Sequence, residues 1–364
     1  MKRIIRHTLG ISLGQIVFAT QAGALFGYSL LWTILLGTIA IILYVEMCGR
    51  VAAVTSEAVF AVVRSRLGKG LGTATLVSAN LLGLISCAAM LGAIGIVLHL
   101  LTGWNERLMI VLGAVALGAL VWFISVQWIE RTFGLLGLLM LAFVVAAVKV
   151  SHFAATAPVP THQSLLYGYF AVGIFSALLM QYKVAISGVA LGSLVTCALL
   201  VLGAAVFRPR GIFPDLLSSM PLPAALPLGR AGLWIALLGM LGSLGGAAVQ
   251  TAMSVGYNTC EFYAIRSEAP PFTAAWVSTL VLATLIVLSG VPPLKLVHYS
   301  IVLGMVMMPL TYYPILVAAG DRARMGEHAT KRVAHALGWA FLVLIGVAAV
   351  CAIPLMVLTR VGRP

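Results

Sequence analysis

The sequence predicts an all-α polytopic membrane protein with about eleven transmembrane helices, and two observations lead to that fold class. Of the 364 residues, 62% are hydrophobic and only 9% are charged, whereas a soluble domain carries about a quarter charged residues. Apolar runs of about 20 residues, long enough to cross a bilayer as a helix, recur along the chain. This composition excludes a soluble enzyme, a secreted disulfide scaffold and a disordered protein, because polar residues could not cover so much apolar surface.

The expected spans follow one another with only short connections. A polar segment at 152–164 contains no Lys or Arg and is expected outside the cell, between the fifth and sixth spans. We therefore expect a single transmembrane domain over residues 1–364, without a soluble domain. The expected spans are 9–25, 28–48, 72–101, 108–127, 133–151, 165–182, 186–207, 231–257, 272–290, 296–318 and 336–358.

The chain is strongly basic, with 22 Lys and Arg against nine Asp and Glu. In a soluble protein this excess would indicate nucleic acid, but here most basic residues fall in short loops on one side, as the positive-inside rule requires. The exception is the segment 208–230, which is placed outside and carries three arginines. We expect a bacterial inner-membrane protein with a cytoplasmic N-terminus, the lipid bilayer as partner and no nucleic-acid partner.

Two of the spans contain unusually many small and polar residues. The first includes Gly14, Gln15 and Gly23, and the polar residues of the sixth crowd its end at Gln181. Backbone departs from helix inside a membrane only where protein or a water-filled cavity satisfies it. Interrupted helices at matching places in two repeats are typical of inverted-repeat secondary transporters. The alternative is that the small residues only permit close helix packing.

Four segments resemble one transporter family. Gln21–Trp32 is similar to the end of the first helix and the start of the second in Nramp (natural resistance-associated macrophage protein) metal-ion transporters. Glu46–Arg50, Val201–Gly211 and Asp321–His328 are similar to later parts of bacterial Nramp-like proteins. The resemblance covers nearly the whole chain and implies a secondary transporter that imports a divalent metal, commonly manganese or iron, coupled to protons.

The resemblance also implies a domain organisation. It is a LeuT-type fold of two inverted five-helix repeats plus one extra helix. On the spans given above, the first repeat covers about 9–151 and the second about 165–318. The extra helix covers about 336–358.

The family's metal site falls on residues that differ here from the family pattern. Its first helix breaks at an Asp-Pro-Gly-Asn motif, which falls on Ser12–Gln15, and its sixth carries Ala-x-x-Met-Pro-His, which falls on Ala177–Tyr182. The resemblance thus implies Ser12, Gln15, Ala177 and Met180 as candidate metal-binding residues, and this set is neutral. Met307 in the tenth span is a further candidate that, with Met180, would form a softer site.

The neutral set leaves the cargo open. A hard divalent cation favours carboxylate ligands, and burying an ion without a counter-charge costs on the order of 20 kcal/mol even for a monovalent one in the Born limit. The alternatives are a carrier of a neutral or anionic small solute, or a non-transporting membrane subunit or sensor. Both methionines could also simply fill gaps in the core. The sequence contains no catalytic or ATP-binding motif, so we expect no enzyme and no cofactor other than a transported metal ion.

Three further residues are candidates for proton relay or gating: Glu46, Tyr182 and Lys183. Glu46 could carry protons, but Arg50 stands four residues later, the spacing of a helical salt bridge. Lys183 would exclude cations if it pointed into the pathway, and it is an ordinary cytoplasmic charge if it does not. His298 begins the tenth span and is expected to be solvated near the membrane interface.

Overall fold

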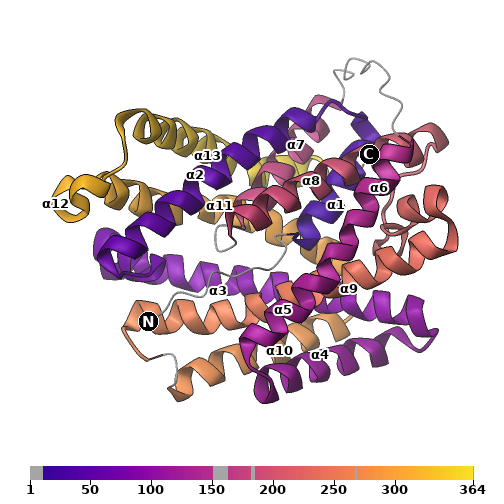
Figure 1. Cartoon of the computed structure of the whole chain (residues 1–364), viewed down its shortest axis with the longest axis horizontal. Helices are drawn as coiled ribbons and strands as arrows, with labels where there is room; N and C mark the ends of the chain where they lie inside the picture. The colour runs from indigo at the N-terminus through magenta and orange to yellow at the C-terminus, as the bar shows by residue number, and fades with distance from the viewer. Residues whose placement is uncertain (1–10, 151–162, 182–184, 267–268, 364) are drawn as a thin grey trace.

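The computed structural model describes residues 11–150, 163–181, 185–266 and 269–363, and most of them are helical. The helices run roughly along the long axis of the molecule (Figure 1). Their bounds are α1 Leu13–Phe26, α2 Leu31–Thr55, α3 Val59–Thr102, α4 Glu106–Phe123, α5 Val126–Gly137, α6 Leu141–Val150, α7 Ser164–Leu179, α8 Ile186–Leu202, α9 Leu222–Tyr263, α10 Pro270–Leu288, α11 Pro293–Gly320, α12 Arg322–Met325 and α13 Arg332–Leu358.

The eleven predicted spans are all present as helices. Within the described residues, nine segments are long and apolar enough to cross a membrane, and α1 and α7 are shorter apolar helices. The fifth span consists of α5 and α6 joined by a 3-10 turn, and it begins at Val126 rather than at 133. Two helices are longer than expected, because α3 and α9 each continue past a glycine corner, at Gly68 (φ 73°) and Gly229 (φ 67°). Only glycine adopts such positive φ values without strain.

The helices form two groups of four. One contains α1, α2, α7 and α8, and the other contains α3, α4, α9 and α10. Each group therefore combines two consecutive spans with the two that follow five spans later. Two of the remaining spans lie at the boundary, since α6 packs against α8 and α9, and α11 packs against α2, α3 and α7. The last span, α13, packs against α11, α7 and α2. The boundary between the two groups is where the site described below is found.

The first group is held together by a close crossing of α1 and α8. A Cβ atom on Gly23 would lie 2.0 Å from the carbonyl oxygen of Leu200, and a Cβ on Gly203 would lie 2.3 Å from the carbonyl oxygen of Thr20. The two backbones touch because neither glycine has a side chain, as is common where membrane helices pack closely. At Gly23, then, the small residue serves helix packing, the alternative considered for these residues.

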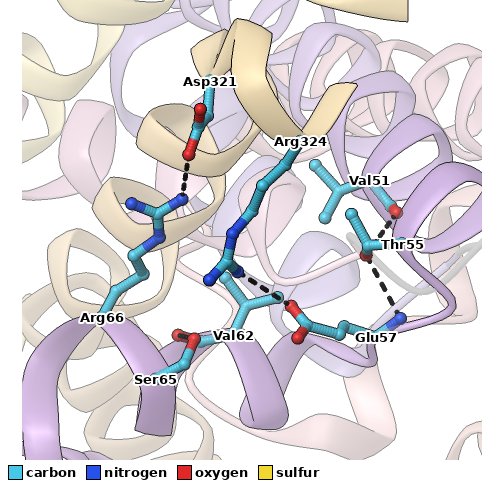
Figure 2. Close-up of polar contacts among 8 residues, drawn as sticks. All are labelled: Val51, Thr55, Glu57, Val62, Ser65, Arg66, Asp321 and Arg324. Carbon is cyan, nitrogen blue, oxygen red and sulfur yellow. Dashed lines mark hydrogen bonds and ion pairs between the residues drawn. The ribbon is translucent and has the colours of Figure 1, made fainter. Parts of the chain in front are cut away.

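Ion pairs join the helices at one end of the bundle, which we call the arginine-rich end; α12 marks it at the left of Figure 1. Figure 2 shows the Arg66 guanidinium 2.7 Å from an Asp321 carboxylate oxygen and that of Arg324 3.7 Å from Glu57. Asp321 also caps α12, since its Oδ1 accepts a hydrogen bond from the Ala323 amide. These contacts tie the start of α3 to the end of α11.

We predict that Gly23→Ala destabilises the protein. The added methyl group has only backbone atoms to displace, so we expect a loss of about 1–3 kcal/mol of unfolding free energy, as for other overpacked cores. The melting temperature of detergent-purified protein measures it. The control is Gly49→Ala in α2, where an added Cβ meets nothing within 4 Å. Equal melting temperatures for the two variants would contradict the close α1–α8 crossing.

We predict a pH-dependent effect for Asp321→Asn. The hydrogen bond from Arg66 holds the pKa of Asp321 below its ordinary value. A lowered folded-state pKa adds stability above the unfolded pKa, about 3.9, and that stability is lost as the pH falls through the folded pKa. Asparagine can still cap α12, so the variant loses only the charge. Its melting temperature should lie below that of the wild type at pH 7, and the difference should close below about pH 4.

The control for this prediction is Glu57→Gln. Its partner Arg324 is farther away and both side chains are more exposed than the Arg66–Asp321 pair. Exposed ion pairs contribute little, so the control should show a smaller difference at pH 7. An unchanged difference between pH 7 and pH 3 for Asp321→Asn would contradict a role for its charge.

Candidate functional site

The first helix begins inside the protein rather than at its surface. Ser12 caps α1: its hydroxyl accepts a hydrogen bond from the Gln15 amide at 3.3 Å, and the Gln15 side-chain oxygen accepts one from the Ser12 amide at 2.8 Å. This reciprocal capping box fixes the start of the helix. With 14 residues, α1 is about 21 Å long, short of the roughly 30 Å hydrocarbon core.

The sixth span, α7, is also short and ends beside the start of α1. It has 16 residues and is followed by a turn at Met180 and Gln181. The Gln181 side-chain amide donates a hydrogen bond to Gln15 Oε1 at 2.5 Å, and both side chains are buried. The start of span one and the end of span six therefore meet at this contact.

This contact changes what Gln15 can do. Its Oε1 accepts hydrogen bonds from both the Ser12 amide and the Gln181 side chain, which uses both lone pairs of the oxygen. Its Nε2 is buried without a partner among the described residues. In this conformation Gln15 therefore holds the two helix ends together, and its oxygen has no lone pair left for a metal ion.

A cavity of about 200 Å³ lies beside this junction. Residues of α3, α5, α9 and α11 line it together with the ends of α1 and α7, so it occupies the boundary between the two helix groups. Hydroxyl and amide groups supply its polar surface, and no described lining residue is charged. The polar lining residues include Ser12, Ser86, Gln181, Gln250, Thr251 and Asn258.

The structure brings three of the five predicted binding residues to this cavity. Ser12, Met180 and Met307 line it. Gln15 lies behind Ser12, and Ala177 is fully buried against α1, 3.5 Å from the position of a Cβ on Gly14. Among the candidates for relay or gating, Tyr182 and Lys183 lie outside the described residues.

Glu46 is engaged away from the cavity. Its carboxylate accepts a hydrogen bond from Arg50 Nε at 2.9 Å, and Arg50 also reaches the carbonyl oxygen of His328. Both residues belong to the arginine-rich end. The structure therefore contains the i, i+4 salt bridge that the spacing indicated, and Glu46 does not line the cavity.

The expectation that His298 is solvated is wrong. Its side chain is 3% exposed, and its Nδ1 lies 2.8 Å from the Tyr169 hydroxyl. The rings of Phe18 and Phe170 pack against the same pair, and the turn containing Gly362 covers it. The position of His298 near the end of a span does not predict this burial, because the residues that bury His298 belong to α1, α7 and the segment after α13.

These aromatic residues form a packed cluster to one side of the cavity. Each of the three helices α1, α7 and α11 carries at least one residue of this cluster and has one cavity residue on it or at its end, namely Ser12, Met180 or Met307. On each helix the aromatic residue lies farther from the arginine-rich end than the cavity residue does. On the other side, the cavity follows α9 as far as Asn258, and Phe262 one turn later accepts a hydrogen bond from Arg64. The cavity thus extends toward the arginine-rich end, and the aromatic cluster lies between its lining residues on α7 and α11 and the opposite end.

Sequence reasoning missed two features of the site. Gln250, Ser254 and Asn258 form a polar face of α9 along the cavity, and their spacing of four residues was visible in the sequence. Glu130 was placed in a loop, but α5 begins at Val126, so this acid is buried within a span one turn from Phe133. An ionisable group inside a span is a functional candidate by default.

Comparison with known proteins decides the family. The model of Nramp, natural resistance-associated macrophage protein-like, matches residues 11–187 and 184–354. The chain belongs to the Nramp family. Its resemblance at Gln21–Trp32 and the three later segments is thereby confirmed, and the chain is a membrane transporter of this family.

One curated relative and several solved structures match this chain over most of its length. The divalent metal cation transporter MntH of Ralstonia nicotianae is 27% identical over 388 residues, covering 90% of this chain and 84% of that protein. The manganese transporter of Eremococcus coleocola, solved in complex with an aromatic bis-isothiourea substituted compound, superposes with a TM-score of 0.75 at 16% identity, covering 99% of this chain and 87% of that one. The inward-facing structure of Mhp1 gives a TM-score of 0.53 at 16% identity over 97% and 88%. The predicted LeuT-type fold is confirmed.

We predict that Gln15 and Gln181 are energetically coupled. Gln15→Leu and Gln181→Leu should each lower the unfolding free energy by about 1–3 kcal/mol, because each leaves a buried amide without its partner. The double variant should lose less unfolding free energy than the two single variants together, because the second substitution leaves no further buried group without a hydrogen-bond partner. Denaturant unfolding in detergent measures all three.

The control pair for this cycle combines Gln181→Leu with Gln21→Leu. Gln21 is also a buried amide of α1, but its nitrogen donates to the Pro214 carbonyl oxygen at 2.9 Å, away from the bond between Gln15 and Gln181. These two changes should add. Additive losses for Gln15 and Gln181 would show that the junction is not held by this bond.

Proposed function

We propose that this Nramp chain is a secondary transporter that holds a metal cation in the cavity at the α1–α7 junction. Transport would move the group of α1, α2, α7 and α8 against the group of α3, α4, α9 and α10. The observation that carries the proposal is the pair of short helices whose ends meet beside a cavity lying between these two groups. Two five-helix repeats, about 9–151 and 165–318, would produce this pairing of spans.

The cargo follows from the relatives and from the lining. A similar protein is described as a divalent metal cation transporter and another as a manganese transporter. The cavity here provides the Ser12 hydroxyl and the thioethers of Met180 and Met307. A volume of about 200 Å³ is below the range of about 300–1,000 Å³ common for pockets that hold drug-sized ligands, and it suits an ion with a few waters.

The orientation follows from charge. By the positive-inside rule the arginine-rich end would be cytoplasmic. We propose a cytoplasmic N-terminus and, from the bacterial relative, the inner membrane as location. The cavity, which extends toward that end, then opens to the cytoplasm, and the Tyr169–His298 cluster closes the outside. Proton coupling requires a titratable group near the cavity, and the buried Glu130 is one turn of α5 from the lining residue Phe133.

A second cargo class is favoured by one observation. The side chains of Gln250 and Asn258 bring amide groups to the cavity, and no described lining residue is charged. Such a surface also fits a small neutral solute, which would hydrogen-bond to the amides. The two cargo hypotheses predict uptake of different compounds into the same vesicles.

We predict that Ser254→Phe blocks transport. Ser254 lines the cavity, so a phenyl ring there fills it. Uptake into proteoliposomes is measured for Mn²⁺, Cd²⁺ and Ag⁺ and for labelled small solutes. The wild-type protein should transport one of these two classes, metals or solutes, and the uptake rate of that class should fall at least tenfold in the variant. The control is Ser278→Phe on α10, where the side chain is exposed on the outer surface.

Each result of the uptake experiment decides between cargoes. Metal uptake that Ser254→Phe abolishes and Ser278→Phe leaves intact supports the proposal. Solute uptake alone supports the second cargo class. Wild-type vesicles that take up neither would overturn transport in favour of a membrane subunit or sensor.

A further inference from the structure

Four methionines line the cavity. They are Met90 of α3, Met180 after α7, and Met307 and Met308 of α11. Methionine is a frequent gap filler in hydrophobic cores, so their number alone assigns no role. Their arrangement around the cavity is what carries the inference.

Three of the sulfurs come from one small region. A Cβ atom on Gly304 would lie 2.7 Å from Met180 Sδ, so the Met180 thioether rests directly on α11 at Gly304. Met307 and Met308 follow Gly304 by three and four residues, and helix residues at these spacings are neighbours on one face. The thioethers of Met180, Met307 and Met308 therefore converge from two elements on the same wall of the cavity.

Two of the four sulfurs lie near hydroxyl groups of the cavity lining. The Thr251 hydroxyl lies 3.9 Å from Met90 Sδ, and the Thr311 hydroxyl lies 4.0 Å from Met308 Sδ. Both threonines line the cavity, as does Ser86. Ser86 Oγ is buried without a hydrogen-bond partner among the described residues. An unpartnered hydroxyl beside thioethers is a place for a ligand or a water.

The charge of the lining selects the ion. No described residue of the lining is charged, and no group of three or more His, Cys, Asp or Glu in the described part of the chain could hold a metal ion. The Born cost of desolvating an ion rises with the square of its charge, so a dication costs about four times as much as a monocation of equal size. Thioethers favour soft ions such as Cu(I), whereas carboxylates and carbonyls suit Mg²⁺, Ca²⁺ and Mn²⁺.

We propose that the cavity binds a soft monovalent d¹⁰ cation, of the Cu(I) or Ag(I) class, through the thioethers of Met180, Met307 and Met308, with Met90 on the facing helix. The site differs from a manganese site in having sulfur in place of carboxylate. The inference that this ion is the cargo rests on the proposed transport function; the binding site itself does not.

Silver ion is the probe, because it is soft and monovalent and undergoes no redox step on binding. Purified full-length protein in detergent is titrated with Ag⁺ by calorimetry, and with Mn²⁺ in parallel. The test variant is the double change Met180→Leu and Met307→Leu, which keeps the volume of the side chains and removes two sulfurs. The matched control is Met109→Leu with Met140→Leu, two buried methionines outside the cavity lining.

The five cysteines also bind silver, and all three proteins retain them. The difference between the proteins therefore reports the methionines. We expect wild type and control to bind one Ag⁺ that the cavity variant binds at least tenfold more weakly, and no Mn²⁺ at that site. Equal Ag⁺ binding by wild type and cavity variant, with all three folded as judged by melting temperature, overturns the inference, and so does Mn²⁺ binding that the cavity variant loses.

The uptake experiment separates this inference from the transport proposal. If Mn²⁺ enters vesicles, Ser254→Phe blocks it and Ag⁺ binding is unaffected by the methionines, transport stands and the soft-ion site fails. If Ag⁺ binding depends on the methionines and no metal or solute enters, the site stands and transport fails. Methionine-dependent binding together with Ag⁺ uptake supports both.

Discussion

The site depends on one contact, the hydrogen bond between the Gln181 and Gln15 side chains. It joins the end of one short helix to the start of another inside the bundle. The capping box provides acceptors for the backbone amides of Ser12 and Gln15, and the Gln181 side chain completes the bonding of the Gln15 side-chain oxygen. Without such local bonding, helix ends in this environment would be costly, and the cavity would have no defined wall.

The rest of the fold supplies rigid supports for that junction. The glycine-mediated crossing of α1 and α8 positions α1 within its own helix group. The Tyr169–His298 pair and its aromatic neighbours fill the space beyond the junction on one side, and the ion pairs of the arginine-rich end join α3 to α11 on the other. The cavity is the space left where the two groups meet, and it extends toward the arginine-rich end.

Family membership and site chemistry give different information here. The Nramp family and the LeuT-type fold hold over nearly the whole chain. The ligand set does not follow from the fold, because a site is defined by its side chains rather than by the architecture that carries it. Among the residues that the structure describes, hydroxyls, amides and thioethers supply the polar lining of the cavity, and none of them is charged. Such a surface discriminates among ions by softness and charge, since it offers no counter-charge to a hard dication.

The sequence alone determined the membrane class, the eleven spans and the family, because apolar run length, the positions of basic residues and motif segments such as Gln21–Trp32 are all local properties. It also identified the Glu46–Arg50 pair, whose spacing lies within one helix. Tertiary structure decided the rest: the burial of His298, the second bond on Gln15, and the convergence of Met180 with Met307 and Met308. Each depends on which helices pack together, and partners more than a hundred residues apart leave no periodic signal in the chain.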